Sequence, residues 1–257
     1  MCLLLISYNT NTEFPFIVAA NRDEFYSRPT EKAGFWKEYT GLLAGRDLEA
    51  GGTWLGITKS GRFAGITNFR DLHRIMENAP TRGLLTLNFL ASGISAFQYG
   101  ENLKEKAADY NGYNLLFSDM KNLFYFSNQT GELSRFDSGI YGLSNHLLDT
   151  PWPKVVQSKN AFIDAVSKDK LVPEDLFNIL SDDREAPDDQ LPETGLSREL
   201  ERIVSPVFIK SDRYGTRSST VILINRMNEV LFIEKSLDTR TEKWVESKFS
   251  FLLKAGR

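Results

Sequence analysis

The 257-residue sequence contains one cysteine and two histidines, and these shortages exclude several kinds of site. The single cysteine, Cys2, cannot form an internal disulfide and is typical of a protein from a reducing compartment. His73 and His146 stand apart from other metal-ligating residues, so no metal site is expected. A serine–histidine–aspartate hydrolase would have to use one of these histidines, and no Gly-x-Ser-x-Gly motif is present. We expect His146 to lie half-exposed at a sheet rim.

Long apolar runs and a one-sided charge are also lacking. No stretch approaches the roughly 20 apolar residues of a membrane helix, and the opening residues lack the basic region of a secretory leader. We therefore expect a cytoplasmic protein without stable membrane insertion. Lys and Arg number 31 against 34 Asp and Glu, and no long basic run occurs, which argues against a nucleic-acid partner. No glycine-rich phosphate loop is present, so no nucleotide cofactor is expected. The sequence does not determine the oligomeric state.

Two apolar runs at the start of the chain predict a β-hairpin. Met1–Tyr8 and Phe14–Ala20 read as strands, and the polar residues between them favour a turn. If Tyr8 pairs with Phe14, Cys2 pairs near Ala20, within one or two residues. This register places Arg22 and Asp23 beside Cys2.

Cys2 in this setting has the chemistry of a nucleophile. Removal of Met1 would give Cys2 a free α-amine, whose pKa of about 7.7–8.0 suits a base for a thiol of pKa about 8.5. Arg22 would favour the thiolate electrostatically. The alternative is that Cys2 is a small buried core residue, as free cysteines often are. Arg22 and Asp23 would then only form an ion pair that caps the hairpin.

The remaining pattern predicts an α+β protein with antiparallel sheets, because its strands come as hairpins and its helices cluster centrally. Phe25–Tyr39 reads as irregular. The expected strands are Thr53–Thr58, Arg62–Asn68, Asn114–Ser118, Leu123–Ser127, Gly139–Ser144, Ser219–Asn225, Glu229–Lys235 and Thr241–Leu252. The expected helices are Arg82–Ala91, Ile94–Ala108, Thr150–Ser167, Pro173–Leu180 and Ser197–Val204. No linker stands out, so residues 1–257 are expected to form one domain.

Several short strings, taken in order, resemble one protein family. They are Met1-Cys2, Asn21-Arg22-Asp23-Glu24, Ala44-Gly45-Arg46-Asp47, Gly51-Gly52-Thr53-Trp54-Leu55-Gly56, Thr67-Asn68, Gly142-Leu143-Ser144-Asn145 and Gly215-Thr216-Arg217-Ser218-Ser219. The chain resembles the NRDE proteins, relatives of the transport and Golgi organisation protein 2 family, over most of its length. The resemblance implies an N-terminal nucleophile hydrolase-like fold, which is a four-layer αββα sandwich of two antiparallel sheets between helical layers.

The resemblance also implies site residues and a reaction. In the cysteine N-terminal nucleophile amidases, an arginine and an aspartate flank the nucleophile, and Arg22 and Asp23 match them, although here the two are adjacent. By order and context, Asn145 resembles the oxyanion donor and Arg217 resembles a late supporting arginine. The implied reaction is hydrolysis of a carbon–nitrogen amide bond in a small, partly apolar substrate, with Cys2 as nucleophile.

The resemblance leaves a second function open. A member of this family could instead be a non-catalytic binding or carrier protein for a lipid or haem-like ligand. The catalytic hypothesis makes a geometric prediction: the side chains of Cys2, Arg22, Asp23, Asn145 and Arg217 should line one concave pocket, because an oxyanion donor must sit about 3 Å from the developing charge.

Overall fold

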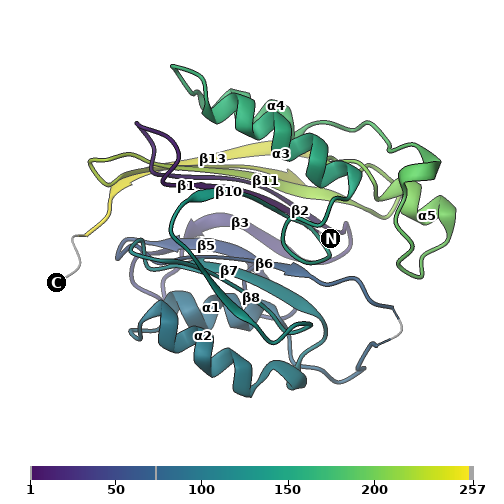
Figure 1. The fold of residues 1–257 in the computed structure, drawn as a ribbon, viewed down its shortest axis with the longest axis horizontal. Coiled ribbons are helices and arrows are strands. Elements are labelled where there is room, and N and C mark those ends of the chain that lie inside the picture. Colours follow the sequence, from purple (N-terminus) through teal and green to yellow (C-terminus); the bar gives the residue numbers. More distant parts are fainter. Residues whose placement is uncertain (1, 73, 255–257) are drawn as a thin grey trace.

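Two antiparallel sheets pack face to face between outer layers of helices in the computed structural model, which describes residues 2–72 and 74–254 (Figure 1). Met1, the expected processing site, and His73 lie outside the described residues. The six-stranded sheet has the order β10 (Gly139–Leu143), β1 (Cys2–Tyr8), β2 (Phe16–Phe25), β11 (Tyr214–Ile224), β12 (Glu229–Asp238), β13 (Lys243–Leu252). The seven-stranded sheet follows chain order through β3 (Thr30–Phe35), β4 (Leu42–Asp47), β5 (Leu55–Thr58), β6 (Phe63–Asn68), β7 (Tyr113–Ser118), β8 (Leu123–Ser127), β9 (Leu133–Phe136). The expected αββα sandwich is confirmed.

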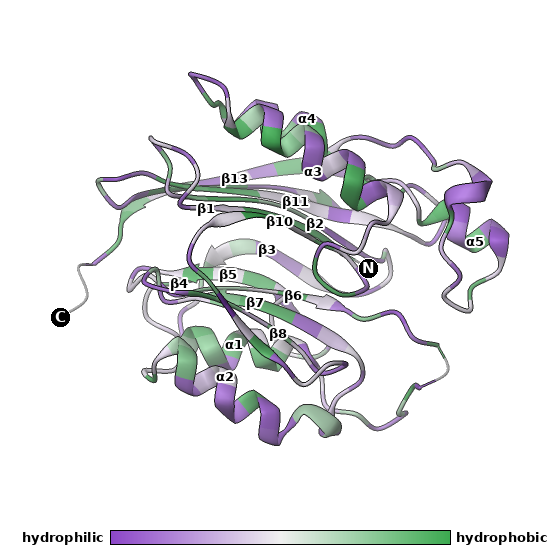
Figure 2. Cartoon of the chain, in the orientation of Figure 1, coloured by the Kyte–Doolittle hydropathy of each residue, from purple (hydrophilic) through white to green (hydrophobic). Residues whose placement is uncertain are grey.

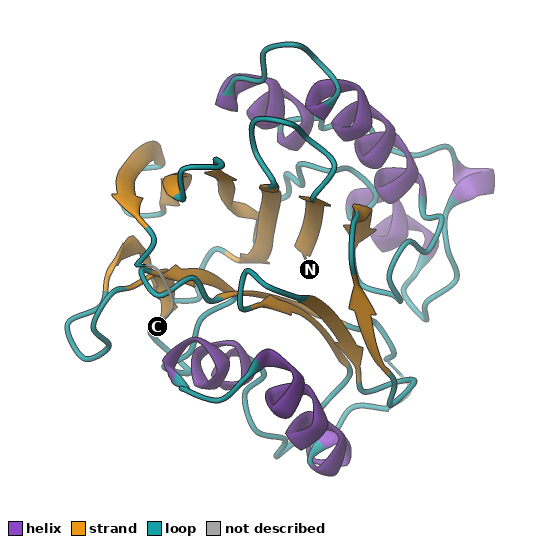
Figure 3. Ribbon diagram, turned by 60° about the vertical axis from the view of Figure 1, so that its left-hand side comes forward, coloured by secondary structure: helices purple, strands orange, loops and turns teal. Residues whose placement is uncertain are grey.

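Each sheet carries helices on its outer face (Figure 3). Helices α3 (Pro153–Val166) and α4 (Pro173–Leu180) cover the six-stranded sheet, while α1 (Gly83–Ala91) and α2 (Ala96–Glu105) cover the seven-stranded sheet. The short α5 (Arg198–Ile203) and two 3-10 turns at Ala107–Asp109 and Asp188–Gln190 complete the helices of the described residues. Of the helices described, none is both long and apolar enough to cross a membrane.

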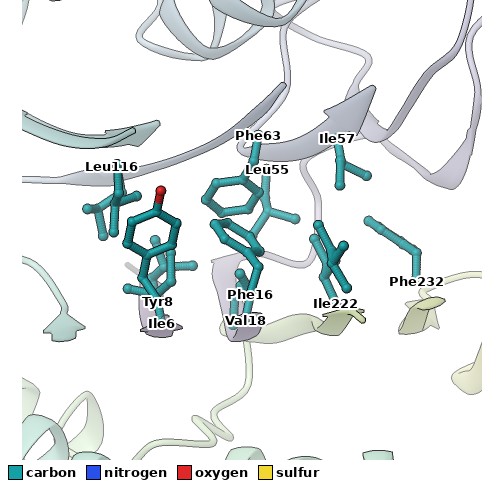
Figure 4. Close-up of a cluster of buried hydrophobic side chains, with 14 of the residues drawn as sticks. Ile6, Tyr8, Phe16, Val18, Leu55, Ile57, Phe63, Leu116, Ile222 and Phe232 are labelled. Atoms are coloured by element: carbon teal, nitrogen blue, oxygen red, sulfur yellow. The ribbon is translucent and has the colours of Figure 1, made fainter. Parts of the chain in front are cut away.

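The apolar core between the sheets explains why they stack. Side chains alternate across a strand, so every second residue of β1, β2, β11 and β12 points toward the other sheet. Figure 4 shows Tyr8, Phe16, Ile222 and Phe232 of these strands pointing toward side chains of the seven-stranded sheet, among them Phe63 of β6. Burying each large side chain contributes about 1.5–3 kcal/mol to folding. In Figure 2 the hydrophobic colour follows these strands, and the loops around α5 are mostly hydrophilic.

The first hairpin forms, but its strands pair two residues away from the predicted register of Tyr8 with Phe14, because the turn is longer. Tyr8 pairs with Phe16, and Cys2 therefore pairs directly with Arg22. The shift has a local cause, because the Asn11 side chain accepts hydrogen bonds from the backbone N–H groups of Glu13 and Phe14, at 2.9 Å and 2.8 Å. These bonds draw both residues into the turn. Pairing with β11 carries β2 on to Phe25, so Arg22 and Asp23 lie within β2 and do not follow its end.

The sequence pattern missed three strands, two of which bury few apolar residues. Phe25–Tyr39 was expected to be irregular, yet β3 lies within it, and only Ala33 of that strand is buried. Strand β9 has no buried residue. Strand β4 is buried but lies in Ala44-Gly45-Arg46-Asp47 and its flanks, where glycine and charge hide the strand pattern. Among the described strands, the edge strands β3 and β9 each pair with one neighbour only, so they carry few of the buried apolar residues that mark a strand in a sequence.

Candidate functional site

Cys2 lines a pocket of about 140 Å³ at one end of the space between the sheets. The residue is partly buried at the start of β1, and its backbone carbonyl accepts a hydrogen bond of 3.0 Å from the Ser144 hydroxyl. The residues that line the pocket are Cys2, Arg22, Asp23, Glu24, Arg28, Asp47, Thr53, Trp54, Ile66, Asn68, Thr81, Arg82 and Gly83. Several strings singled out in the sequence therefore meet at this one pocket.

Arg22 lies opposite Cys2 and is held on several sides. Its guanidinium carbon sits 4.3 Å from the centre of the Trp54 ring, and Nη1 donates to the Thr30 hydroxyl at 3.2 Å. Nη2 lies 3.7 Å from Glu24 and 3.8 Å from Asp47. A planar guanidinium suits stacking and ion pairing at the same time. Arg22 is thus a fixed positive charge at the edge of the pocket.

Asp23 is buried and is positioned by β11. The Thr216 hydroxyl donates to its carboxylate at 2.7 Å, and the Tyr214 hydroxyl donates to its backbone carbonyl at 3.0 Å. Burial raises the pKa of Asp23 above its ordinary value, and the ammonium of Lys154 is the foremost of the charges that oppose this rise. Asp23 is therefore a buried carboxyl close to the thiol, in surroundings where burial disfavours its negative charge.

The Cys2 thiol does not behave as expected from its arginine neighbour. Burial raises its pKa above the ordinary value, and the negative charge of Asp23 raises it further, while Arg22 opposes both with a smaller effect. The expectation that Arg22 favours the thiolate has the right sign, but loss of hydration outweighs it. At neutral pH the thiol keeps its proton, so it needs a base in order to attack.

Asn145 lies next to this site without lining the pocket. It is fully buried just after β10, and its Nδ2 donates to the backbone carbonyl of Asn68 at 2.8 Å. The backbone carbonyl of Asn145 accepts a hydrogen bond of 2.7 Å from the Arg70 backbone N–H. Asn145 thus fixes the end of β6, which carries the pocket residue Asn68. The geometric prediction puts Asn145 in the pocket, whereas the structure buries it outside the pocket lining, hydrogen-bonded to Asn68 and Arg70.

Arg217 faces a different cavity from Cys2. It sits at a bulge in β11 between Thr216 and Ser218. Its Nη1 donates to the carbonyls of Phe25, Tyr26 and Arg28, at 2.8 Å, 3.3 Å and 3.0 Å. The bulge turns this side chain toward the loop after β2. The prediction that all five residues line one pocket therefore holds for Cys2, Arg22 and Asp23, and is wrong for Asn145 and Arg217.

Two basic residues near the thiol carried no sequence signal. Arg82 lines the pocket just before α1, and its Nη1 donates to the Gly112 carbonyl at 2.9 Å. Lys154, in the first turn of α3, is buried, and its Nζ has no hydrogen-bond partner among the described residues. Burial lowers the pKa of Lys154 to about 8, against the opposing effect of Asp23. Neither stands in a recognisable motif, so only the tertiary structure could find them.

His146 takes no part in the pocket. Its Nδ1 lies 2.8 Å from the Thr150 hydroxyl, and its ring lies against Phe69, with ring centres 4.7 Å apart. The residue is half-buried, close to the expected rim position. Within residues 2–72 and 74–254, no three His, Cys, Asp or Glu side chains converge in a way that could hold a metal ion.

Gly45 makes room for the tryptophan that supports Arg22. A Cβ atom at Gly45 would lie 2.2 Å from a ring carbon of Trp54, well inside van der Waals contact. We expect Gly45→Ala to displace the ring and lower the free energy of unfolding by about 1–3 kcal/mol, as overpacking does. Urea denaturation would measure this loss.

Gly34→Ala is a matched control on the neighbouring strand β3, because a Cβ atom there meets nothing within 4 Å. Its stability should stay within about 0.5 kcal/mol of the wild type. Equal stability of the two variants would show that the Trp54 ring is free to move away.

Comparisons with known proteins place these features in context. A family model described as "Transport and Golgi organisation 2" matches residues 1–239. The Transport and Golgi organization 2 homolog of Mus musculus is 33% identical over 277 residues, covering 99% of this chain and 100% of that protein. The homologue of Bos taurus is 34% identical over 282 residues, with the same coverage of 99% and 100%.

Solved structures share the fold at low sequence identity. A mutant of the conjugated bile acid hydrolase from Clostridium perfringens has a TM-score of 0.56 at 11% identity, covering 98% of this chain and 96% of that chain. Penicillin V acylase from Agrobacterium tumefaciens has a TM-score of 0.50 at 12% identity, covering 96% and 90%. This likeness confirms the N-terminal nucleophile hydrolase-like sandwich. With a family model over most of its length and relatives above 30% identity from end to end, the chain belongs to the transport and Golgi organisation 2 family.

Proposed function

We propose that this protein is an N-terminal nucleophile hydrolase that cleaves a carbon–nitrogen amide bond in a small, partly apolar substrate. The observation that carries the proposal is the pocket that gathers Cys2, Arg22 and Asp23 where the register pairs Cys2 with Arg22. A structural cysteine in the core would not need a cavity beside it or a fixed positive charge opposite it. The shared fold of a bile acid hydrolase and a penicillin acylase supports the same reaction class.

The reaction begins with a proton transfer, because the thiol is protonated at neutral pH. The α-amine of Cys2, free after removal of Met1, takes the thiol proton while sulfur bonds to the amide carbon. The tetrahedral intermediate then breaks its C–N bond, and the amine proton goes to the departing nitrogen. Water attacks the remaining thioester, giving its proton to the same amine. Cleavage of the C–S bond releases the carboxylic acid and restores the thiol. Asp23 holds the α-amine in place.

Stabilisation of the oxyanion falls to donors that line the pocket. Asn145, the donor expected from the resemblance, uses one N–H on the carbonyl of Asn68. We assign the direct role to the Asn68 side chain and the Arg82 guanidinium, which both line the pocket, with Asn145 as a positioning residue. Preorganised donors of this kind are each worth about 10²–10³ in rate.

A test of the proposal uses protein in which Met1 has been removed, as verified by intact mass spectrometry. A panel of N-acyl amides of graded chain length is added, and amine release is followed with a fluorogenic reagent. We expect turnover of at least one amide. The matched control carries one glycine inserted ahead of Cys2, which keeps the thiol but removes its α-amine, and it should be inactive. Full activity of the control, or no turnover by the processed protein, would contradict the proposal.

The alternative function, a carrier for a lipid or haem-like ligand, finds support in one observation. A second, larger groove of about 740 Å³ adjoins the Cys2 pocket. A carrier would use this groove without any bond cleavage. Processed protein that binds amides tightly but leaves them intact would favour this reading.

A further inference from the structure

The larger groove borders the Cys2 pocket and shares two lining residues with it, Arg28 and Trp54. Its volume of about 740 Å³ lies within the range of small-molecule sites. It is walled by the loop after β2 and by β3 on one side, and by β11, β12 and the start of β13 on the other. Trp54, which lines both cavities, stacks on Arg22 of the Cys2 pocket.

A row of paired residues joins the two cavities across the six-stranded sheet. Cys2 pairs with Arg22, Arg22 pairs with Ser218, and Ser218 pairs with Ser236. Directly opposed residues on neighbouring strands point to the same face, and neighbouring strands lie about 4.8 Å apart. Ser218 is therefore roughly 10 Å from Cys2 along this row, two strand spacings away. Both Ser218 and Ser236 line the groove.

Two buried polar groups of the groove lack partners. The Ser218 hydroxyl and the Arg217 Nε have no hydrogen-bond partner within the described part of the chain, although both residues are more than nine-tenths buried. The hydrogen bonds of Arg217 go to three backbone carbonyls, and the ion pairs found among the described residues do not include it. A buried cation with a free N–H is costly unless an acceptor meets it. The acceptor that best fits a guanidinium and a hydroxyl together is a carboxylate.

We propose that the groove binds the distal part of the amide substrate, and that Arg217 and Ser218 together bind a carboxylate carried by that part. This inference rests on the proposed function for the position of the scissile amide at Cys2. An extended chain gains about 1.2 Å per bond, since a residue of three bonds spans about 3.3–3.6 Å. The carboxylate carbon therefore lies about eight bonds from the scissile carbonyl. The substrate class is an amide with an acid group at the far end of a mainly apolar chain.

Acidic side chains in the groove set the conditions for a test. Asp238 pairs with Arg240 at 3.5 Å, and Glu31 lies on the β3 side. Glu234 is buried, accepts from the Ala33 backbone N–H at 2.7 Å and from the Thr220 hydroxyl at 3.3 Å, and has its pKa raised to about 7 by burial. A measurement at pH 6 keeps most of the Glu234 carboxyl neutral, so it does not repel an anionic probe.

The test measures binding to the Cys2→Ala protein, so that no turnover is needed. The probes are mono-anilides of dicarboxylic acids from succinic to sebacic acid, each compared with its methyl ester by isothermal titration calorimetry. We expect the acid to bind at least tenfold more tightly than its ester at suberic and azelaic lengths, and no preference at succinic length. N-acetyl-8-aminooctanoic acid, with the acid on the amine side, shows which half of the amide occupies the groove.

Three variants complete the test. Ser218→Ala and Arg217→Lys should each remove most of the preference for the acid, because one loses the hydroxyl and the other loses the Nε donor. Ser134→Ala, a partly buried serine on β9 of the other sheet, should leave it unchanged. Equal binding of acid and ester at every length, or a preference that survives in Ser218→Ala, would overturn the subsite. Tight acid binding by a wild type that cleaves no amide would overturn the proposed function and leave the subsite standing.

Discussion

The Cys2→Ala protein is expected to fold like the wild type and to hydrolyse no amide. Alanine replaces a small, partly buried side chain at the start of β1, so we expect a stability cost of about 1 kcal/mol, typical of a point mutation. Removal of a nucleophile removes the covalent pathway entirely, and losses of about 10⁶-fold in kcat are known for such variants. Turnover would be measured by amine release and stability by urea denaturation.

This variant separates the two readings of Cys2. It keeps the α-amine at the N-terminus after Met1 is removed, so any loss of activity belongs to the thiol. Cys2→Ser serves as a matched control of similar size, whose hydroxyl should restore little of the rate. A Cys2→Ala protein that unfolds would favour the core-residue reading, and one that retains full activity would show that the nucleophile lies elsewhere.

Between pH 4.5 and pH 8, the wild type is expected to lose about 3 kcal/mol in its free energy of unfolding through Glu234, and Glu234→Gln should not show this loss. Burial raises the pKa of Glu234 from 4.5 to about 7 in the folded protein, so the folded state binds its proton more tightly than the unfolded state. This contribution is fully present below pH 4.5 and is lost as the pH rises through 7. A rise of about 2.5 pKa units corresponds to about 3 kcal/mol. Glutamine stays neutral at every pH, its Oε1 can accept from the Ala33 N–H, and its Nε2 can donate to the Thr220 hydroxyl oxygen.

The measurement is the free energy of unfolding by urea at the two pH values for both proteins. Comparison of wild type with variant isolates Glu234, because all other titrating groups are common to both. Glu132→Gln, an exposed glutamate in the turn before β9, is the matched control and should follow the wild type. If the free energy of unfolding changed with pH by the same amount in Glu234→Gln as in the wild type, Glu234 would be ionised in the folded protein at pH 5 to 7.

Much of the first hairpin could be read from the sequence because its contacts are local. Two apolar runs with a short polar link leave few possible registers, and all of these place Arg22 close to Cys2. The remaining error of two residues came from one side chain, since Asn11 captures two backbone N–H groups and lengthens the turn. Helix α4 was also predicted to the residue, because proline and acidic residues mark its first turn.

The positions of Asn145 and Arg217 could not be read in the same way, although both were singled out as site residues. In the sequence pattern Asn145 follows one predicted strand and Arg217 precedes another, which indicates the path of the backbone but not the direction of the side chain. A bulge in β11 turns Arg217 toward the loop after β2, and a hydrogen bond to Asn68 holds Asn145 behind the pocket. Both outcomes depend on segments more than 70 positions away.

The sequence by itself determined the strand that carries Cys2, the charged pair beside it, the α+β class and the family. These follow from local pattern, short loops and ordered motifs, all of which act over a few residues. Only the tertiary structure decided that Arg82 and Lys154 approach the thiol, that burial outweighs Arg22 in setting the thiol pKa, and that a second groove opens beside the pocket. The physical reason is that desolvation and cavities arise where distant segments pack together, and no local pattern encodes how much water that packing excludes.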